Sequence, residues 1–171
     1  WIRKNSEKKY DKNGLLAAKG ICNKIILEQA QELFANRSDQ KFLSLDVNDF
    51  DVSFVRGLSL EDGSSTLTEL TAMIISSILS TIVKNNKNSN FQILVSGGGR
   101  KNSYMMKRIR DNSSNKLNIK SIDDHGIDGD FVESQAFAFL AIRSFLNLPI
   151  SFPQTTGCEI SSTGGELIKF E

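Results

Sequence analysis

Three consecutive glycines, Gly97, Gly98 and Gly99, follow the apolar run Phe91–Val95 and precede a helix-like segment that starts near Asn102. A strand, glycine turn and helix in this order can offer backbone N–H groups to a phosphate, or lie flat against a base and ribose. The spacing in "SGGGRKN" is neither G-x-G-x-x-G nor G-x-x-x-x-G-K-[ST]. Two interpretations therefore stay open, a nucleotide contact and a tight connection with Asn102 as helix N-cap, and both can hold together.

A second candidate site is the acidic stretch between the predicted strand and the last apolar helix. Its polar residues are Asp123, Asp124, His125, Asp128, Asp130 and Glu133. Clustered carboxylates can coordinate Mg²⁺, hold sugar hydroxyls or transfer protons. However, "DFVE" places Asp130 and Glu133 three residues apart before an apolar helix, which is typical of a capping box. Spacing alone favours capping, and His125 is interpreted as a loop residue.

Composition excludes several other classes of chemistry. The two cysteines, Cys22 and Cys158, and the single histidine lack metal-ligand spacing, and no G-x-S-x-G motif is present. The net charge of +1 gives no broad attraction to nucleic acid or to a membrane surface. The basic group at residues 107, 108 and 110 is interpreted as a solvated helix face, and Cys22 as a buried residue on an apolar helical face.

These candidate residues need an α/β framework to position them. Apolar periodicity predicts a helix over residues 14–34, and a second helix after "LEDGSS" that ends at "NNKNSN", with Ser64 or Ser65 as N-cap. Phe91–Val95 is predicted to be a strand buried on both faces, "LNIKSI" a second strand, and "FVESQAFAFLAIRSFLN" a helix apolar on most sides. A helix between the two strands predicts a parallel pair, and ligands of such sheets bind where strands end.

Six blocks of the sequence resemble, in the same order, the C-terminal half of the anhydro-N-acetylmuramic acid kinases. They are "WIRKNSEKKYDKNG", "SLDVNDFD", "EDGSSTLTELTA", "LVSGGGRKNSYMM", "GIDGDFVESQAFAFLAIRSFLNLP" and "FPQTTG", from Trp1 to about Gly157. The resemblance implies a ribonuclease-H-like α/β lobe of the actin, heat-shock ATPase and sugar kinase superfamily, in which two lobes close over ATP. The family uses ATP and water to open the 1,6-anhydro ring and phosphorylate O6, giving N-acetylmuramate 6-phosphate for peptidoglycan recycling.

The resemblance also implies roles for individual residues. Gly97, Gly98 and Gly99 match the glycines on the adenosine side, and Asn102 matches the asparagine that closes that motif. Glu133 matches a glutamate that faces the amino sugar, which leaves Asp130 as the cap. Mg²⁺ is expected to arrive with ATP, and no metal ligand is assigned within the chain.

Two parts of the family pattern are missing or altered. The phosphate-binding loop belongs to the N-terminal lobe, and the catalytic base is an aspartate of a D-T-G-P-x-N motif expected upstream of Trp1. The family usually has Pro-Pro-Lys before "SLD", whereas this chain has Lys41-Phe42-Leu43. We therefore expect residues 1–171 to be a single C-terminal lobe without turnover of its own, since positioning and base activation need both lobes.

Other interpretations stay open at this stage. A degenerate, non-enzymatic remnant or nucleotide-binding module is favoured by Phe42-Leu43 and by the opening on Trp1, from which we expect that an upstream part was removed or not recorded. An oxidoreductase domain is disfavoured by the glycine spacing. A cytoplasmic location is expected, because no secretory signal is seen and cysteines are few. A lone lobe would expose an apolar face, which predicts self-association or a missing partner lobe.

Overall fold

The protein is described by a computed structural model over residues 1–38, 50–85 and 91–168. The chain forms two compact units, residues 1–121 and residues 122–171. Phe42 and Leu43, where the sequence departs from the family pattern, lie outside the described residues.

The first unit is a mixed α/β domain. Its helices and strands are α1 (Ile2–Asn5), η1 (Lys12–Gly14), α2 (Leu15–Lys19), α3 (Lys24–Ser38), η3 (Ser53–Val55), α4 (Leu60–Asn85), β1 (Phe91–Val95), η4 (Gly98–Lys101), α5 (Ser103–Asp111) and β2 (Leu117–Ser121). β1 and β2 pair in parallel, in a register that runs from Phe91 opposite Leu117 to Val95 opposite Ser121. The predicted α/β class and parallel strand pair are confirmed, while the ribonuclease-H-like lobe stays a prediction.

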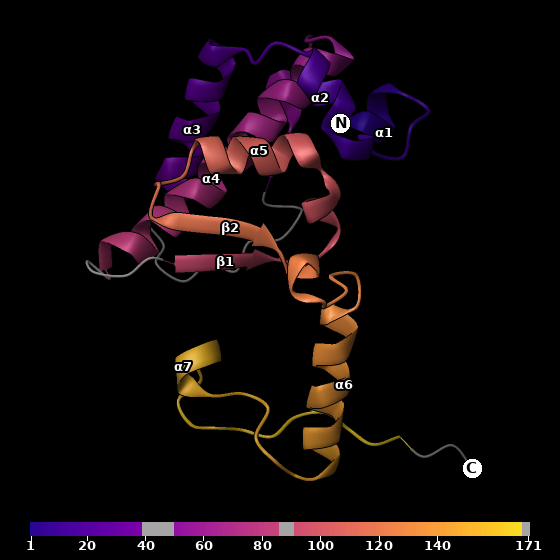
Figure 1. Ribbon diagram of the computed structural model, residues 1–171, viewed down its shortest axis with the longest axis vertical. Helices are drawn as coiled ribbons and strands as arrows, with labels where there is room; N and C mark the ends of the chain where they lie inside the picture. Colours follow the sequence, from indigo (N-terminus) through magenta and orange to yellow (C-terminus); the bar gives the residue numbers. More distant parts are fainter. Residues whose placement is uncertain (39–49, 86–90, 169–171) are drawn as a thin grey trace. The chain divides into compact units, whose positions relative to one another are not determined.

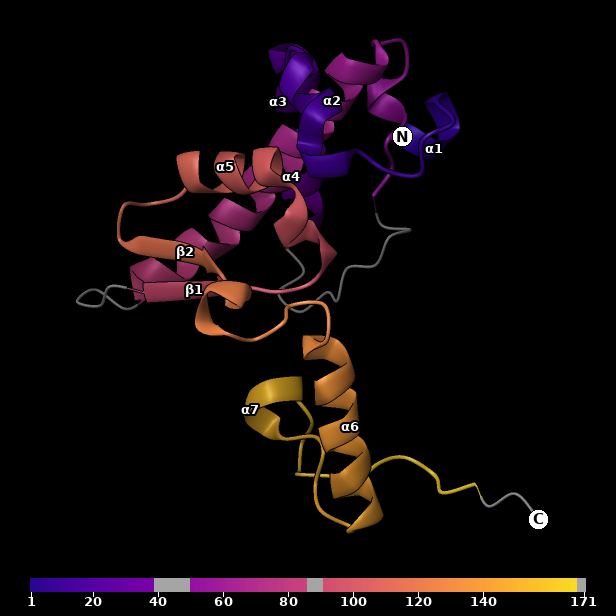
Figure 2. The same ribbon diagram turned by 45° about the vertical axis from the view of Figure 1, so that its right-hand side comes forward.

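One face of this sheet carries the main core. The long helix α4 and the crossover helix α5 lie on the same side of β1 and β2 (Figure 1), as the turned view in Figure 2 also shows. Ala72 of α4, Met106 and Ile109 of α5, and Ile119 of β2 are buried there, with Ile93 and others packed against them. β1 alternates half-buried and exposed residues, so the prediction of a strand buried on both faces is wrong.

The predicted helix over residues 14–34 is also wrong, because α2 and α3 are separate. Gly20 is extended, and a Cβ at this position would lie 2.1 Å from the carbonyl oxygen of Glu61. The Ile21 N–H donates to an Asp62 carboxylate oxygen, and the Asn23 N–H donates to Thr66 Oγ1. Hydrogen bonds to α4 therefore override a continuous apolar period. Cys22 lies in this connection, half-buried, and burial raises the pKa of its thiol.

Helix α4 begins earlier than the sequence pattern indicated. The Asp62 N–H donates to Ser59 Oγ at 3.0 Å, so Ser59 is the cap and the prediction of Ser64 or Ser65 is wrong. Ser64 and Ser65 are buried within the helix, and Ser64 Oγ donates back to the Leu60 carbonyl. The helix needs a glycine at position 63, because a Cβ there would lie 2.6 Å from the Trp1 ring.

A partly buried ion pair joins α4 to α5. Arg108 donates from Nε and Nη2 to the two carboxylate oxygens of Glu69, at 2.5 and 2.8 Å, and Asn112 adds a third hydrogen bond at 3.0 Å. The hydrogen bond from Arg108 holds the pKa of Glu69 below its usual range, against the opposing effect of burial. The predicted solvated basic face is thus wrong for Arg108, although Lys107 is exposed and pairs with Asp111.

The second unit contains η5 (Ile122–His125), α6 (Val132–Phe145) and the short α7 (Pro153–Thr156). The predicted apolar helix is confirmed as α6, which contains no buried residue. Its exposed side chains include Phe137, Ile142 and Phe145. The chain after α6 folds back: Arg143 Nε donates to the Pro149 carbonyl at 2.6 Å, and an isolated bridge pairs Ser151 with Ser162.

Candidate functional site

A cavity of about 560 Å³ opens beside the triple-glycine turn, at the carboxyl end of β1. We call it the glycine-turn pocket. It is lined by Tyr10, Asp11, Lys12, Asn13, Gly98, Gly99, Lys101, Asn102 and Met105. Its volume is typical of small-molecule sites, and the end of a parallel strand is where α/β sheets bind ligands.

The three glycines of the turn have different structural requirements. Gly97 has φ +79°, a conformation in which any side chain is strained. A Cβ on Gly99 would lie 3.1 Å from the terminal methyl of Met105, which is flexible enough to move. Gly98 has no positive φ, and within the part of the chain that the structure describes no atom lies within 4 Å of the place that a Cβ on it would take. Neither the backbone conformation nor the packing of the described residues therefore requires a glycine at position 98. The absence of a side chain there leaves open space at the pocket.

Asn102 joins the glycine turn to helix α5. Its side-chain oxygen accepts a hydrogen bond from the Met105 N–H at 2.9 Å, which confirms the predicted N-cap. The same oxygen lies 2.2 Å from where a Cβ on Gly14 would be. Asn102 thus caps α5 and also packs closely on Gly14, which directly follows the lining residues Tyr10–Asn13.

The segment Tyr10–Asn13, which lines the same pocket, was not predicted from the sequence as part of the site. Asp11 accepts hydrogen bonds from the N–H groups of Leu16 and Ala17, at 2.8 and 2.9 Å, and so fixes the start of α2. Asn13 has φ +58° and Gly14 has φ +71°, so the chain turns sharply before α2. The Asn-Gly pair is a turn signal that could have drawn attention to this segment.

The pocket carries more positive than negative charge. Lys12 and Lys101 line it, while the one carboxylate in the lining, Asp11, already accepts two backbone N–H groups. The neighbouring Arg100 donates from Nη1 to the Gly97 carbonyl at 3.0 Å, which supports the turn from outside the lining. An anionic ligand with a flat part matches this combination of cations and glycine surface.

The acidic stretch belongs to the second unit. The Gly129 N–H donates to Asp123 Oδ1 at 3.1 Å, and the Asp130 N–H donates to Asp128 Oδ1 at 2.9 Å, so two of its carboxylates order the loop itself. Helix α6 starts at Val132 with Phe131 as the N-cap residue and no side-chain cap. The prediction of Asp130 as the cap is therefore wrong, because it lies one residue too early.

Glu133 lies exposed in the first turn of α6, and His125 is exposed at the end of η5. Gly97, Gly98, Gly99 and Asn102 belong to the first unit and Glu133 to the second. Their predicted contacts with nucleotide and sugar stay predictions. Over residues 1–38, 50–85 and 91–168, no group of three His, Cys, Asp or Glu side chains gathers in a way that could hold a metal ion.

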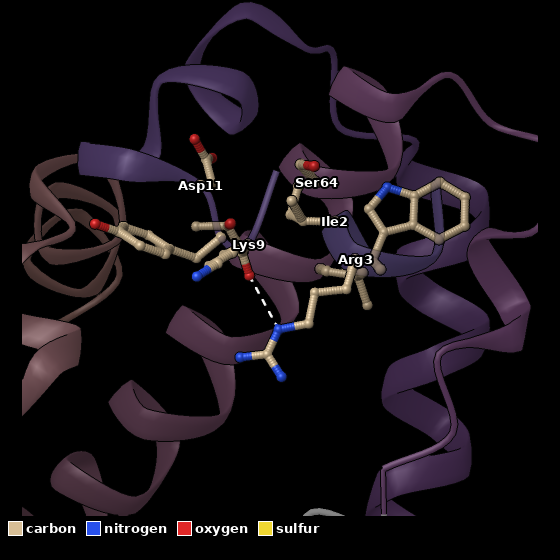
Figure 3. A pocket seen from close by; sticks show the side chains of 9 residues that line it. Ile2, Arg3, Lys9, Asp11 and Ser64 are labelled. Atoms are coloured by element: carbon tan, nitrogen blue, oxygen red, sulfur yellow. Dashed lines mark hydrogen bonds between the residues drawn. The ribbon is translucent and has the colours of Figure 1, made fainter. Parts of the chain in front are cut away.

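A second, smaller cavity of about 410 Å³ shares the lining residues Tyr10 and Asp11 with the first. Figure 3 shows its labelled side chains, with Arg3 Nε donating to the Lys9 carbonyl at 3.0 Å. Its other lining residues are Trp1, Ile2, Ser64, Leu67 and Thr68. None of the residues predicted from the glycine motif or the acidic stretch lines this second cavity.

Fold and pocket together define an α/β protein with a glycine-lined, cationic cavity at a strand-to-helix junction. The sequence model of the family "Anhydro-N-acetylmuramic acid kinase" matches residues 1–169, and the chain belongs to this family.

Individual relatives agree with this assignment. The chain is 48% identical over 169 residues to a protein of Pelagibacter ubique named anhydro-N-acetylmuramic acid kinase; the match covers 99% of this chain and 45% of the relative. Proteins of the same name from Zymomonas mobilis and Brucella anthropi are 37% and 35% identical, with 98% of this chain matched in both, and 44% and 43% of the relatives. The chain thus spans less than half the length of these relatives.

No helix within the described ranges is both long and apolar enough to cross a membrane.

Proposed function

We propose that the chain is the C-terminal, adenosine-side lobe of an ATP-dependent kinase that converts 1,6-anhydro-N-acetylmuramate to N-acetylmuramate 6-phosphate. One observation carries the proposal: Gly98 lines the cavity, although the packing of the described residues leaves room for a side chain at this position. This glycine occurs in a chain whose family is that of the anhydro-N-acetylmuramic acid kinases. The ribonuclease-H-like architecture, the cytoplasmic location and the role in peptidoglycan recycling are parts of the same proposal.

Each predicted site residue has a physical task in this proposal. Gly97 sets the turn by its positive φ, while Gly98 and Gly99 let the nucleoside approach the backbone. Asn102 holds the start of α5 against the turn. Mg²⁺ accompanies ATP and neutralises phosphate charge. Glu133, exposed on α6, would accept hydrogen bonds from hydroxyl groups of the amino sugar.

The remaining chemistry lies outside these residues. The base that takes a proton from the attacking water, and the loop that positions the transferred phosphate, are expected from another part of the kinase. We therefore expect the isolated 171-residue chain to release no ADP in the presence of ATP and the anhydro-sugar. Self-association of the chain stays a prediction, and light scattering across a concentration series measures it.

The test is a coupled assay on the full-length protein that contains this chain. Addition of ATP and 1,6-anhydro-N-acetylmuramate should release ADP and add both water and a phosphoryl group to the sugar, which mass spectrometry detects. Gly98→Val should raise KM for ATP at least about tenfold, because its side chain enters the pocket. Ser103→Val is the matched control, because Ser103 is exposed on α5 and does not line the pocket.

Thermal melting of both variants should match that of the wild type, since no described atom lies near the new Cβ of Gly98→Val. Glu133→Gln should raise KM for the sugar and leave KM for ATP unchanged. Nucleotide binding without any turnover by the full-length protein would instead support the alternative, a binding module that lacks catalysis. Turnover that is insensitive to Gly98→Val would contradict the assignment of the nucleotide to this pocket.

A further inference from the structure

The Tyr10–Asn13 turn lines the glycine-turn pocket together with two of the three glycines. Its four residues line the cavity together with Gly98, Gly99, Lys101, Asn102 and Met105. The sequence pattern of this segment, "KKYDKNG", is polar and matches no nucleotide-binding motif. Its position beside the glycines therefore indicates a role in ligand binding that its sequence pattern does not indicate.

We propose that this turn is a second nucleotide-binding wall, in which Lys12 pairs with the phosphates of the bound nucleotide. The inference rests on the proposed function, since it takes ATP as the ligand of the pocket. It goes beyond that function by assigning phosphate recognition to a lysine outside the glycine motif.

The turn is fixed in place from both ends. On one side, Asp11 accepts the Leu16 and Ala17 N–H groups at 2.8 and 2.9 Å. On the other side, Gly14 is buried and packs so closely on Asn102 and Tyr104 that a Cβ there would lie 2.2 and 2.6 Å from their atoms. A wall held in this way has a defined position before the ligand arrives, which lowers the entropic cost of binding.

The charges in the pocket favour Lys12 as the residue that contacts the phosphates. Asp11 is the one carboxylate in the lining and already accepts two backbone hydrogen bonds, so it competes weakly for the neighbouring ammonium group. Lys12 is exposed and forms no ion pair with any residue that the structure describes. Among the groups that can bind in a pocket lined by a lysine, a phosphate is favoured over an uncharged group, because it pairs with the ammonium charge.

The test compares Lys12→Gln with Lys19→Gln in the full-length protein. Lys19 lies at the end of α2, is exposed and does not line the pocket, so the second variant makes the same charge change elsewhere. Calorimetry would measure binding of ATP with Mg²⁺, and separately of adenosine. Lys12→Gln should weaken ATP binding about tenfold and leave adenosine binding unchanged. Lys19→Gln should change neither by more than about twofold, and Lys12→Arg should retain most of the affinity for ATP.

Equal ATP affinities for Lys12→Gln and Lys19→Gln would overturn this inference. If Gly98→Val still weakened ATP binding in that case, the proposed function would stand without it. Equal loss of ATP and adenosine binding in Lys12→Gln would also overturn it, because the lysine would then act through the shape of the turn. A full-length protein that binds no ATP would overturn both proposals.

Discussion

The two units of the chain differ in how many side chains their helices bury. In the first unit, helices α4 and α5 bury Ala72, Met106, Ile109 and Ile119 in one cluster over the parallel sheet. In the second unit, α6 contains no buried residue and exposes several large apolar side chains. The glycine turn belongs to this packed first unit, and residues Tyr10–Asn13 of the same unit line the pocket beside it. On the second unit, Glu133 lies exposed in the first turn of α6.

The largest expected effect compares two isoleucines on helices of the two units. Ile109 is 4% exposed and Ile142 is 61% exposed. Ile109→Ala should lower the free energy of unfolding by about 3 kcal/mol, through lost burial and the cavity that remains. Ile142→Ala should change it by less than about 0.5 kcal/mol. Urea denaturation followed by far-ultraviolet circular dichroism measures both, and equal losses would mean that α6 is covered in solution.

A second comparison uses two glycines with nearly the same backbone conformation. Gly14 has φ +71° and Gly157 has φ +69°, but only Gly14 has atoms close to its Cβ position among the residues described. Gly157→Ala should destabilise by about 1 kcal/mol, the strain of a left-handed residue. Gly14→Ala should lose about 2 kcal/mol more, because its methyl group meets Asn102.

The second loss is best followed by Trp1 fluorescence, since this single tryptophan packs on Gly63 in the same unit as Gly14. If Gly14→Ala were no more harmful than Gly157→Ala, the Tyr10–Asn13 turn would not be docked on Asn102 as described.

The Glu69–Arg108 pair provides a third test inside the first unit. The side chains of Glu69 and Arg108 are 11% and 29% exposed, and Arg108→Met leaves the carboxylate without its bidentate partner. We expect a loss of about 2 to 3 kcal/mol, the upper range for a hydrogen bond to a charged group. Lys107→Met breaks the exposed pair with Asp111 and should cost less than about 0.5 kcal/mol. Similar losses in the two variants would show that Glu69 is solvated.

The smallest expected effect is on the pH dependence of stability. Because the folded-state pKa of Glu69 is lowered, its contribution is present above the unfolded-state pKa of about 4.3 and is lost as pH falls through the folded value. Denaturation midpoints should therefore fall more steeply with acid in the wild type than in Glu69→Gln. Parallel pH profiles for the two proteins would contradict the lowered pKa.

The sequence predicted those features that depend on local pattern. The two strands, their parallel pairing, the Asn102 cap and the apolar helix α6 follow from periodicity and spacing along short segments. The break at Gly20 was missed because its cause is a contact with Glu61, about forty residues away in sequence. The Ser59 cap was missed because Ser64 and Ser65 are equally good caps by residue type.

The candidate site shows the same division. The glycine turn could be predicted as a candidate site from the sequence, since three glycines at the end of a strand are unusual. The contribution of Tyr10–Asn13 could not be predicted, because a contact between Gly14 and Asn102, which are distant in sequence, brings this segment to the glycines. The error at Asp130 is a shift of one residue, which spacing alone does not resolve.

A crystal structure of the full-length protein with a non-hydrolysable ATP analogue would test directly whether the glycine-turn pocket binds the nucleotide. We predict that the nucleoside lies against Gly98 and Gly99 at the carboxyl end of β1 and also contacts the Tyr10–Asn13 turn. A nucleotide bound elsewhere, with the glycine turn left without a ligand, would contradict it.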